Sequence, residues 1–157
     1  MTIQERLHEM IRVHGHQCVV NKKKTKELLG VTFTLSKEDF DYTLTKAQQK
    51  YVYDKLRAYR KEVSRAKCRY IRDSNTRQAV VTFSITSNTP NCILSIQVLT
   101  RRSRIYIMVN SRSLDISNKL YQDLEIARKI ALEITDSKTD DIKFLRFFAG
   151  NLHYYVK

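Results

Sequence analysis

The sequence is short of glycine, proline and tryptophan: its 157 residues include three glycines, one proline and no tryptophan. So little glycine and proline excludes collagen-like repeats, flexible linkers and a glycine-rich phosphate loop. No apolar run approaches the roughly 20 residues that span a bilayer, and the first ten residues are too polar for a signal peptide. These absences predict a cytoplasmic protein that has no membrane partner.

Cysteine is also scarce, and Cys18, Cys68 and Cys92 are far apart in the chain. Without a Cys-x-x-Cys pair, neither a zinc site nor a disulfide framework is indicated. Histidines near Cys18 can be drawn as a metal cluster, but a helix end that runs into a loop explains them more simply. We therefore expect no metal ion.

Positive charge is what the sequence has in excess: 29 Lys and Arg face 16 Asp and Glu, which gives a net charge of +13. A surface of this kind favours an anionic partner. That partner is either nucleic acid, bound through its phosphates, or a small phosphorylated ligand. Composition leaves both open, and the small size and Lys richness suit a phage or other viral protein.

Apolar periodicity predicts an α+β fold in a single domain that spans residues 1–157. Helical spacing is expected in residues 2–14, 45–70 and 117–134. β-Branched or alternating segments predict strands at 28–35, 77–85, 92–99, 104–109 and 142–148. A basic turn at 22–26 and a hairpin at 100–103 complete the pattern, and Gly30 indicates either a bulge or a close approach of backbone. The result is a mixed, mostly antiparallel sheet backed by helices.

The basic helical segment 45–70 interleaves tyrosines with lysines and arginines. Such a pattern is suited to gripping RNA or single-stranded DNA. The candidate contacts, which include the basic turn, are Lys22, Lys23, Lys24, Arg57, Arg60 and Arg65. The alternative is a solvated helix whose tyrosines pack inward, and the pattern does not decide between the two.

Three groups near the C-terminus have the chemistry of a nucleotide site. Cys92 opens a strand and can act as a nucleophile, although many free cysteines are buried and inert. Arg112 and Ser113 follow a strand, where a guanidinium and a hydroxyl suit a phosphate monoester or simply form a surface turn. His153 and Tyr155 share one face of an extended chain and can hold a sugar hydroxyl. Each motif is weak alone, but their joint spacing is specific.

The spacing resembles the nucleotide-binding half of the thymidylate synthase family. The matching motifs are Pro90-Asn-Cys92-Ile-Leu-Ser-Ile-Gln97, Arg112-Ser113-x-Asp115, Asp123 and Gly150-x-x-His153-x-Tyr155. Residues 24–33 also resemble the first strand of the family with its lead-in. The resemblance covers residues 22–35 and 75–157.

The resemblance implies a role for each matching residue. Cys92 would attack C6 of a pyrimidine ring, and Arg112 with Ser113 would bind the 5′-phosphate. Asp115, Asp123 and Gln97 would lie at the base, with the backbone around Asp115 touching a base carbonyl. His153 and Tyr155 would hold the 3′-hydroxyl of deoxyribose. Arg77 would reach the phosphate of the partner subunit in a homodimer formed through the sheet face.

Departures from the family pattern shape the expected function. Asp123 stands where members specific for dUMP have Asn, and a carboxyl group there marks the dCMP hydroxymethylase branch. Ile93 replaces a histidine, and residues 36–70 are too few for the helices that carry the folate-facing Trp and the catalytic Glu. The chain also stops at Lys157, before the closing tail of the family. The elements that bind methylenetetrahydrofolate are therefore expected to be absent.

The sequence thus predicts a protein that binds a pyrimidine deoxynucleoside monophosphate, with dCMP favoured over dUMP. It is expected to transfer a methyl or hydroxymethyl group to C5 through Cys92, if it is an enzyme. The alternative is a non-catalytic protein that sequesters nucleotides or binds DNA or RNA on the same fold.

Overall fold

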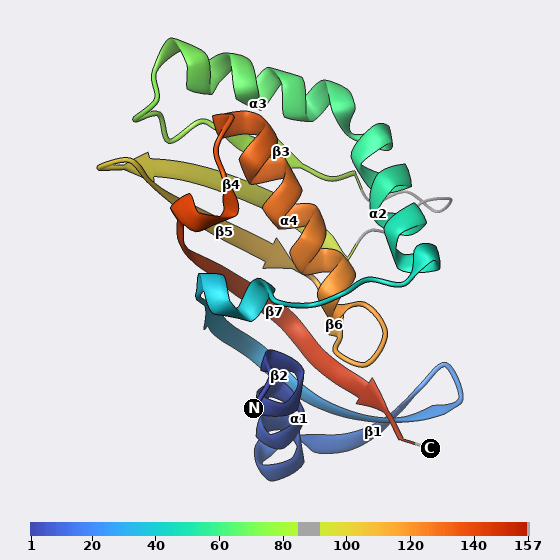
Figure 1. Ribbon diagram of the computed structural model, residues 1–157. Helices are drawn as coiled ribbons and strands as arrows, with labels where there is room; N and C mark the ends of the chain where they lie inside the picture. Colours follow the sequence, from blue (N-terminus) through green and yellow to red (C-terminus); the bar gives the residue numbers. More distant parts are fainter. Residues whose placement is uncertain (85–91, 157) are drawn as a thin grey trace.

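The computed structural model describes residues 1–84 and 92–156, which form a twisted sheet with helices packed on it (Figure 1). The helices are α1 (Ile3–His14), η1 (Lys37–Phe40), α2 (Lys46–Ala58), α3 (Arg60–Arg72), α4 (Leu120–Thr135) and η2 (Thr139–Asp141). The strands are β1 (His16–Val20), β2 (Lys23–Leu35), β3 (Val80–Thr82), β4 (Ile93–Arg101), β5 (Arg104–Ser111), β6 (Leu114–Asp115) and β7 (Ile142–Tyr155). No helix in these two ranges is both long and apolar enough to cross a membrane.

The sheet has the strand order β1-β2-β7-β5-β4-β3, and the short β6 pairs with β7. Its neighbours are antiparallel except for β5 with β7 and β6 with β7, which are parallel. The α+β prediction of a mixed, mostly antiparallel sheet is therefore confirmed. The parallel pairing matters for function because it brings the C-terminal ends of β5 and β7 to the same edge of the sheet.

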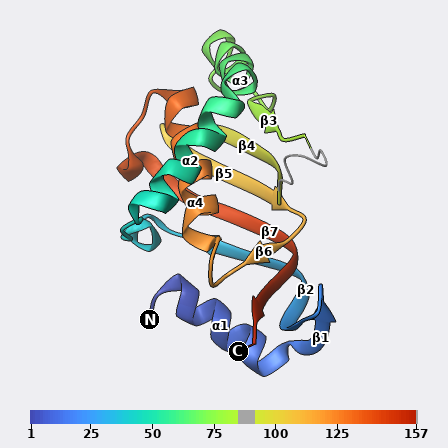
Figure 2. The same cartoon turned by 90° about the vertical axis from the view of Figure 1, so that its right-hand side faces the viewer.

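One face of the sheet is covered by helices and holds the core. Seen from the side, α2 and α4 lie over the central strands, with α3 at one end (Figure 2). Ile96 and Val98 of β4 and Ile107 and Val109 of β5 point into this layer and are almost fully buried. They meet α4, which buries its predicted apolar stripe of Leu120, Leu124, Ala127, Ile130, Ala131 and Ile134.

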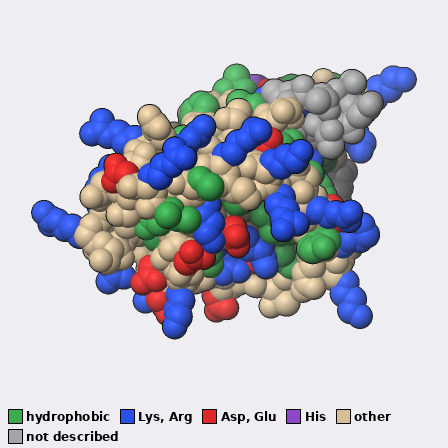
Figure 3. All heavy atoms as spheres, turned by 90° about the horizontal axis from the view of Figure 1, so that it is seen from above, with side chains coloured by type: hydrophobic (Ala, Val, Ile, Leu, Met, Phe, Trp, Pro, Cys, Tyr) green, Lys and Arg blue, Asp and Glu red, His purple; other side chains and the backbone are tan. Residues whose placement is uncertain are grey.

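The predicted helix 45–70 is two helices, α2 and α3, that meet at Tyr59. An unbroken helix of that length would run about 39 Å in one direction. The break lets both halves pack against α4, while the Tyr59 ring contacts Phe83 at a centroid distance of 4.5 Å. The outer side of α3 faces solvent, and Lys and Arg side chains are spread across this side of the molecule (Figure 3).

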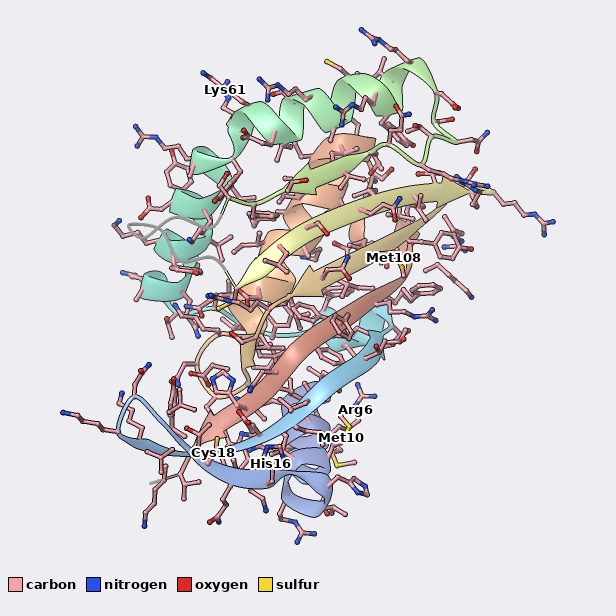
Figure 4. The ribbon with its side chains drawn as sticks, turned by 180° about the vertical axis from the view of Figure 1, so that it is seen from behind. Arg6, Met10, His16, Cys18, Lys61 and Met108 are labelled. Carbon is pink, nitrogen blue, oxygen red and sulfur yellow. The ribbon has the colours of Figure 1, made fainter. Side chains whose placement is uncertain are left out.

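The opposite face of the central strands carries partly exposed aromatic and polar side chains. Tyr106, Met108 and Phe144 are half-buried there, and Phe148 is 41% exposed. The view from behind shows Met108 on this face with no helix over it (Figure 4). We refer to it as the open face.

Several boundaries differ from those that the sequence predicts. The strand expected at 28–35 begins at Lys23, so the basic turn shrinks to Asn21 and Lys22, which have φ of 49° and 64°. Strand β1 was not predicted, because its residues are nearly all exposed and lack apolar alternation.

Neither a bulge nor a close approach of backbone is found at Gly30. Strands β2 and β7 keep one register on both sides of it, from Leu29 opposite Asn151 to Val31 opposite Ala149, and a Cβ at position 30 would meet nothing within 4 Å. Glycine is needed there for its left-handed φ of 63°.

The C-terminal strands also differ from the prediction. Strand β7 continues past Gly150 to Tyr155, whereas the sequence suggested an end at that glycine. Glycine at position 150 leaves room for the backbone of Arg112, because a Cβ at this position would lie 2.8 Å from the carbonyl oxygen of Arg112. Strand β3 covers only residues 80–82 of the predicted 77–85, of which residue 85 lies outside the described ranges.

Candidate functional site

A pocket of about 420 Å³ lies where the end of β7 and the residues after β5 meet the turn between β1 and β2. It brings together four residues that the sequence singled out: Arg112, Ser113, His153 and Tyr155. The remaining lining residues are Val20, Asn21, Thr25, Glu27 and Asn151. A guanidinium, hydroxyls, an imidazole and a phenol in one hollow match the needs of a phosphorylated sugar.

Backbone contacts fix the segment that carries Arg112 and Ser113. The Arg112 amide donates to the carbonyl of Cys92 at 2.7 Å, and the Ser111 hydroxyl lies 3.0 Å from that same carbonyl oxygen. The Ser111 hydroxyl is also 2.6 Å from the carbonyl oxygen of Ser113. The bare Cα of Gly150 allows the backbone of Arg112 to lie against β7. The chain is thus held on both sides where it leaves β5.

Cys92 joins this arrangement through Ser113. The Ser113 hydroxyl donates to the Cys92 sulfur at 3.4 Å, and the thiol is half-buried. The structure therefore places Cys92, the predicted nucleophile, next to Ser113, which is predicted to bind phosphate. Pro90 and Asn91, which belong to the same motif, lie outside the described residues.

A chain of hydrogen bonds sets the tautomer of His153. Glu27 has only acceptor oxygens when ionised, so the amide nitrogen of Asn151 must donate to it. The Asn151 oxygen then faces Nδ1 of His153 at 3.0 Å, which requires the proton of the ring to be on Nδ1. Nε2 is left to accept from a hydroxyl when the ring is neutral. The Asn151 hydrogen bond is the main reason why the pKa of Glu27 is lowered, so this carboxylate is ionised at neutral pH.

Tyr155 closes the far side of the pocket. Its ring meets that of His153 edge to face, with centroids 5.5 Å apart. Lys23 places its ammonium group 5.2 Å from the centroid of the same ring. Together with Arg112, Lys23 gives this hollow a positive potential that favours an anion.

Asp123 lies on α4 in a separate cluster that includes Tyr51. Its carboxyl is fully buried, and loss of hydration raises its pKa to about 7 in spite of the nearby ammonium groups of Lys119 and Lys55. The Lys119 nitrogen sits 3.8 Å from the centroid of the Tyr51 ring, and that of Lys55 is 5.6 Å away. A buried carboxyl that is half protonated at neutral pH is a candidate for hydrogen bonding to a base.

Tyr51 connects this cluster to Cys92. Burial raises the pKa of Tyr51 to about 12, and the negative charges of Asp123 and Cys92 act in the same direction. The pKa of Lys55 is lowered by burial and held up partly by the same two groups. Asp123 and Cys92 therefore lie on one side of the molecule, close enough to share neighbours.

The structure gives the three other predicted residues different surroundings. The Asp115 carboxylate accepts from the backbone amides of Ser117 and Asn118 and from the Asn118 side chain, so it shapes the turn before α4. Gln97 donates to the carbonyl of Arg77 at 2.8 Å, and it alternates with the buried Ile96 and Val98, which places it on the open face. Arg77 itself is exposed. None of these three side chains lines the pocket.

The candidate nucleic-acid contacts fall into two groups at opposite ends of the molecule. Lys22 lies in the β1–β2 turn beside the pocket, and Lys23 and Lys24 begin β2 there. Arg57, Arg60 and Arg65 lie on α2 and α3 (Figure 1, Figure 2). All six are exposed. For metal binding, residues 1–84 and 92–156 contain no group of three His, Cys, Asp or Glu side chains that is placed to hold an ion.

Sequence reasoning missed six residues that complete the two clusters. Thr25, Glu27 and Asn151 line the pocket, and Tyr51, Lys55 and Lys119 surround Asp123. A period-2 pattern of polar residues in β2, paired with the same pattern in β7, signals the first three. Of the second three, Tyr51 and Lys55 lie on α2, which the chain order does not connect with the pocket, and Lys119 directly precedes α4.

The topology and this site arrangement define the fold as thymidylate-synthase-like. The crystal structure of thymidylate synthase from T4 phage has the same fold, with a TM-score of 0.72 over 100% of this chain and 77% of that chain. The two sequences are 15% identical, so the likeness shows the fold alone. No protein-family model matches the sequence, and no curated protein matches it.

Proposed function

We propose that the protein binds a pyrimidine deoxynucleoside monophosphate, with dCMP preferred over dUMP. The observation that carries this proposal is the meeting of Arg112, Ser113, His153 and Tyr155 in one pocket, next to the thiol of Cys92. The T4 phage neighbour is named as a thymidylate synthase, and its fold is consistent with this ligand class.

The 5′-phosphate binds to Arg112 and Ser113. A guanidinium offers two parallel N–H donors to phosphate oxygens, and the Ser113 hydroxyl turns from the Cys92 sulfur to add another. At the other end of the sugar, His153 Nε2 accepts from the 3′-hydroxyl while its Nδ1 stays bonded to Asn151. The hydroxyl of Tyr155 donates to the same sugar oxygen.

The base lies toward Asp123. The carboxyl accepts a hydrogen bond from the exocyclic amino group of cytosine, and its own proton is available to N3 because its pKa is close to 7. Backbone groups around Asp115 contact the base carbonyl, since the side chain is committed to the turn before α4. Gln97 is bonded to Arg77 on the open face and reaches the base only after it moves.

Cys92 is the residue for covalent chemistry. Its thiolate adds to C6 of the ring, and the electron pair of the C5–C6 double bond moves to C5 and on through C4, to N3 in cytosine or to O4 in uracil. A proton from solvent then adds at C5, the original C5 hydrogen leaves as a proton, and elimination restores the thiolate and the ring. This exchange balances without a second substrate, and the same adduct is the one that would accept a methyl or hydroxymethyl group.

The residues around Cys92 do not fit a folate donor of the kind that the resemblance implies. The chain has no Trp, and the positions that surround Asp123 are Tyr51, Lys55 and Lys119. We therefore assign no residue to methylenetetrahydrofolate and derive no one-carbon step.

The active form is a homodimer that forms through the open face. Phe148, Tyr106, Met108 and Phe144 supply an apolar surface there, which favours burial against a second copy. In this arrangement the exposed Arg77 of one subunit reaches the phosphate held by Arg112 of the other. The dimer then supplies the second guanidinium of the phosphate site.

Release of tritium from 5-³H-dCMP and 5-³H-dUMP tests the proposal. We expect release from dCMP that a Cys92→Ser variant abolishes, because the hydroxyl is a far weaker nucleophile. Both forms should gain thermal stability with dCMP, since a ligand at 100 times its Kd stabilises a protein by about 2.7 kcal/mol. Undiminished release from the variant would remove the nucleophile assignment.

A non-catalytic role in sequestering nucleotides is the second candidate. It is favoured by the poor fit of the site to a folate donor. It predicts that dCMP stabilises the protein to the same extent in the wild type and in Cys92→Ser, with no tritium release from either. Failure of both monophosphates to stabilise the protein would exclude both functions.

A further inference from the structure

Helix α3 carries a positive charge that the pocket does not use. Its residues Arg60–Arg72 include six Lys and Arg but only one acidic residue, Glu62. Residues 46–72 together hold ten of the 29 Lys and Arg residues and two of the 16 Asp and Glu residues. A single nucleotide at Arg112 leaves this part of the net charge of +13 unexplained.

Three of the basic residues form a stripe along the outer side of α3. Lys61, Arg65 and Arg72 are four and seven residues apart and lie opposite Val63 and Ala66, which are buried. All three are exposed, and Lys61 points away from the sheet (Figure 4). At a rise of 1.5 Å per residue, the stripe runs about 16 Å.

Within the described part of the chain, no ion pair neutralises the stripe. Lys67 of the same helix pairs with Glu133 and Asp136. By contrast, across residues 1–84 and 92–156, Lys61, Arg65 and Arg72 form no ion pair. Like charges one helical turn apart repel each other, and an anion that lies along them relieves that repulsion.

The positive surface continues onto the hairpin between β4 and β5. Tyr70 in α3 accepts a hydrogen bond from Thr100 at 3.2 Å, which joins the helix to the hairpin. Beyond this contact, Arg102 and Arg104 are exposed at the hairpin turn. Viewed from above, basic side chains spread across this side of the molecule (Figure 3).

We propose that α3 and the β4–β5 hairpin bind the phosphate backbone of a single nucleic-acid strand, at a surface separate from the nucleotide pocket. Lys61 and Arg65 are one turn apart, with about 6 Å between them, and Arg72 is two turns further along at about 10 Å, so one strand that runs along the helix can place its phosphates at all three. Ile71, which is 70% exposed, lies beside the stripe and offers an apolar contact to unpaired bases. Binding is independent of base sequence because the contacts are to phosphates.

This surface is independent of the proposed nucleotide site. It lies on the side of the sheet that carries α2 and α4, so a dimer formed through the open face leaves it accessible (Figure 2). The Lys22–Lys24 turn lies at the other end of the molecule, beside the pocket. That turn provides a control with the same number of charges.

The test is fluorescence anisotropy with labelled oligothymidylate and oligouridylate of about 20 nucleotides, at several salt concentrations. The triple variant Lys61→Gln, Arg65→Gln, Arg72→Gln should bind at least about tenfold more weakly than the wild type. The slope of log affinity against log salt should fall by about 2, since each contact to a single strand contributes about 0.7. The control variant Lys22→Gln, Lys23→Gln, Lys24→Gln should bind like the wild type.

Equal losses of oligonucleotide affinity in the two triple variants would show that binding responds to net charge alone, and this would overturn the proposal. Tighter binding of a duplex of the same length would contradict the preference for a single strand. The variant Lys61→Arg, Arg65→Lys, Arg72→Lys keeps every charge and should bind within a few-fold of the wild type. Circular dichroism of each variant checks that the helices are intact.

Discussion

At the scale of single residues, Asp123 shows how burial prepares a side chain for a task. It is fully buried on α4, and the cost of desolvating a carboxylate outweighs the attraction of Lys119 and Lys55. The site thus holds a carboxyl that carries its proton about half of the time near neutral pH. Ionising this buried carboxyl lowers the free energy of unfolding, and the loss can be measured.

The folded-state pKa of Asp123 is raised from 3.8 to about 7, so its ionisation is easier in the unfolded chain. The stability linked to this group is fully present below pH 3.8 and is lost as the pH rises toward 7. The Asp123→Asn variant stays neutral at every pH. At pH 8 we expect its free energy of unfolding to exceed that of the wild type by up to about 4 kcal/mol, and at pH 4 we expect the two to be nearly equal. Urea unfolding at the two pH values measures the difference. An advantage of equal size at both would show that ionisation is not the cause.

The same substitution tests the role of Asp123 in recognition of the base. An amide offers an N–H donor to O4 of uracil as well as an acceptor to its N3–H. Asp123→Asn should therefore shift the preference from dCMP toward dUMP by about tenfold or more, as two hydrogen bonds change partners. Titration of both nucleotides into both forms gives the ratio. An unchanged ratio would place the base away from Asp123.

The residues of the site could be read from the sequence only in part. Arg112, Ser113, His153 and Tyr155 were found because each follows or lies in a strand at a specific spacing. Glu27 was missed because its role depends on pairing with His153 across two strands that are far apart in the chain. Tyr51 and Lys55 were missed for a similar reason, since a single sequence does not show that α2 packs beside Asp123 of α4.

At the scale of elements, the close approach of β7 to the segment after β5 decides the shape of the pocket. Gly150 permits that approach, because a Cβ would press against the carbonyl of Arg112. The alternation in β2, β4 and β5 was strong enough to predict those strands, and the periodicity of α4 predicted its buried stripe. Strand β1 and the break at Tyr59 were not predictable, because the first is almost fully exposed and the second depends on packing against α4 and Phe83.

We expect Gly150→Ala to destabilise the protein by about 1–3 kcal/mol, the usual cost of forcing an extra carbon into a packed site. It should also weaken the binding of dCMP, because the displaced backbone carries Arg112. Gly30→Ala is the matched control. A Cβ at position 30 would meet nothing within 4 Å, but alanine at a φ of 63° costs about 1–2 kcal/mol. Thermal melts with and without dCMP separate the two effects, and an equal loss of binding in both variants would contradict the role of Gly150.

At the scale of the whole molecule, the sheet divides the surface into parts with different side chains. The helical side carries the basic stripe of α3, the edge holds the pocket, and the open face presents Phe148 and its aromatic neighbours. The overall α+β class followed from the pattern of elements. The use of the open face depends on which residues remain exposed after folding, which only the structure shows.

We expect the protein to sediment as a dimer and Phe148→Asp to sediment as a monomer, since burying a charge at an apolar interface is costly. The monomer should bind dCMP more weakly, because the partner's Arg77 no longer contributes. Ser64→Asp, which changes an exposed residue of α3 on the helical side of the sheet, is a control for added charge. Analytical ultracentrifugation gives the mass of each form. A wild type that is monomeric at all concentrations would end the dimer proposal.

A crystal structure of the protein soaked with dCMP would show whether Cys92, Arg112 and His153 surround one pyrimidine nucleotide. We expect the 5′-phosphate on Arg112 and Ser113, the 3′-hydroxyl on His153 and C6 of the ring facing the Cys92 sulfur. A nucleotide bound elsewhere, or a pocket that stays empty at saturating dCMP, would contradict this expectation.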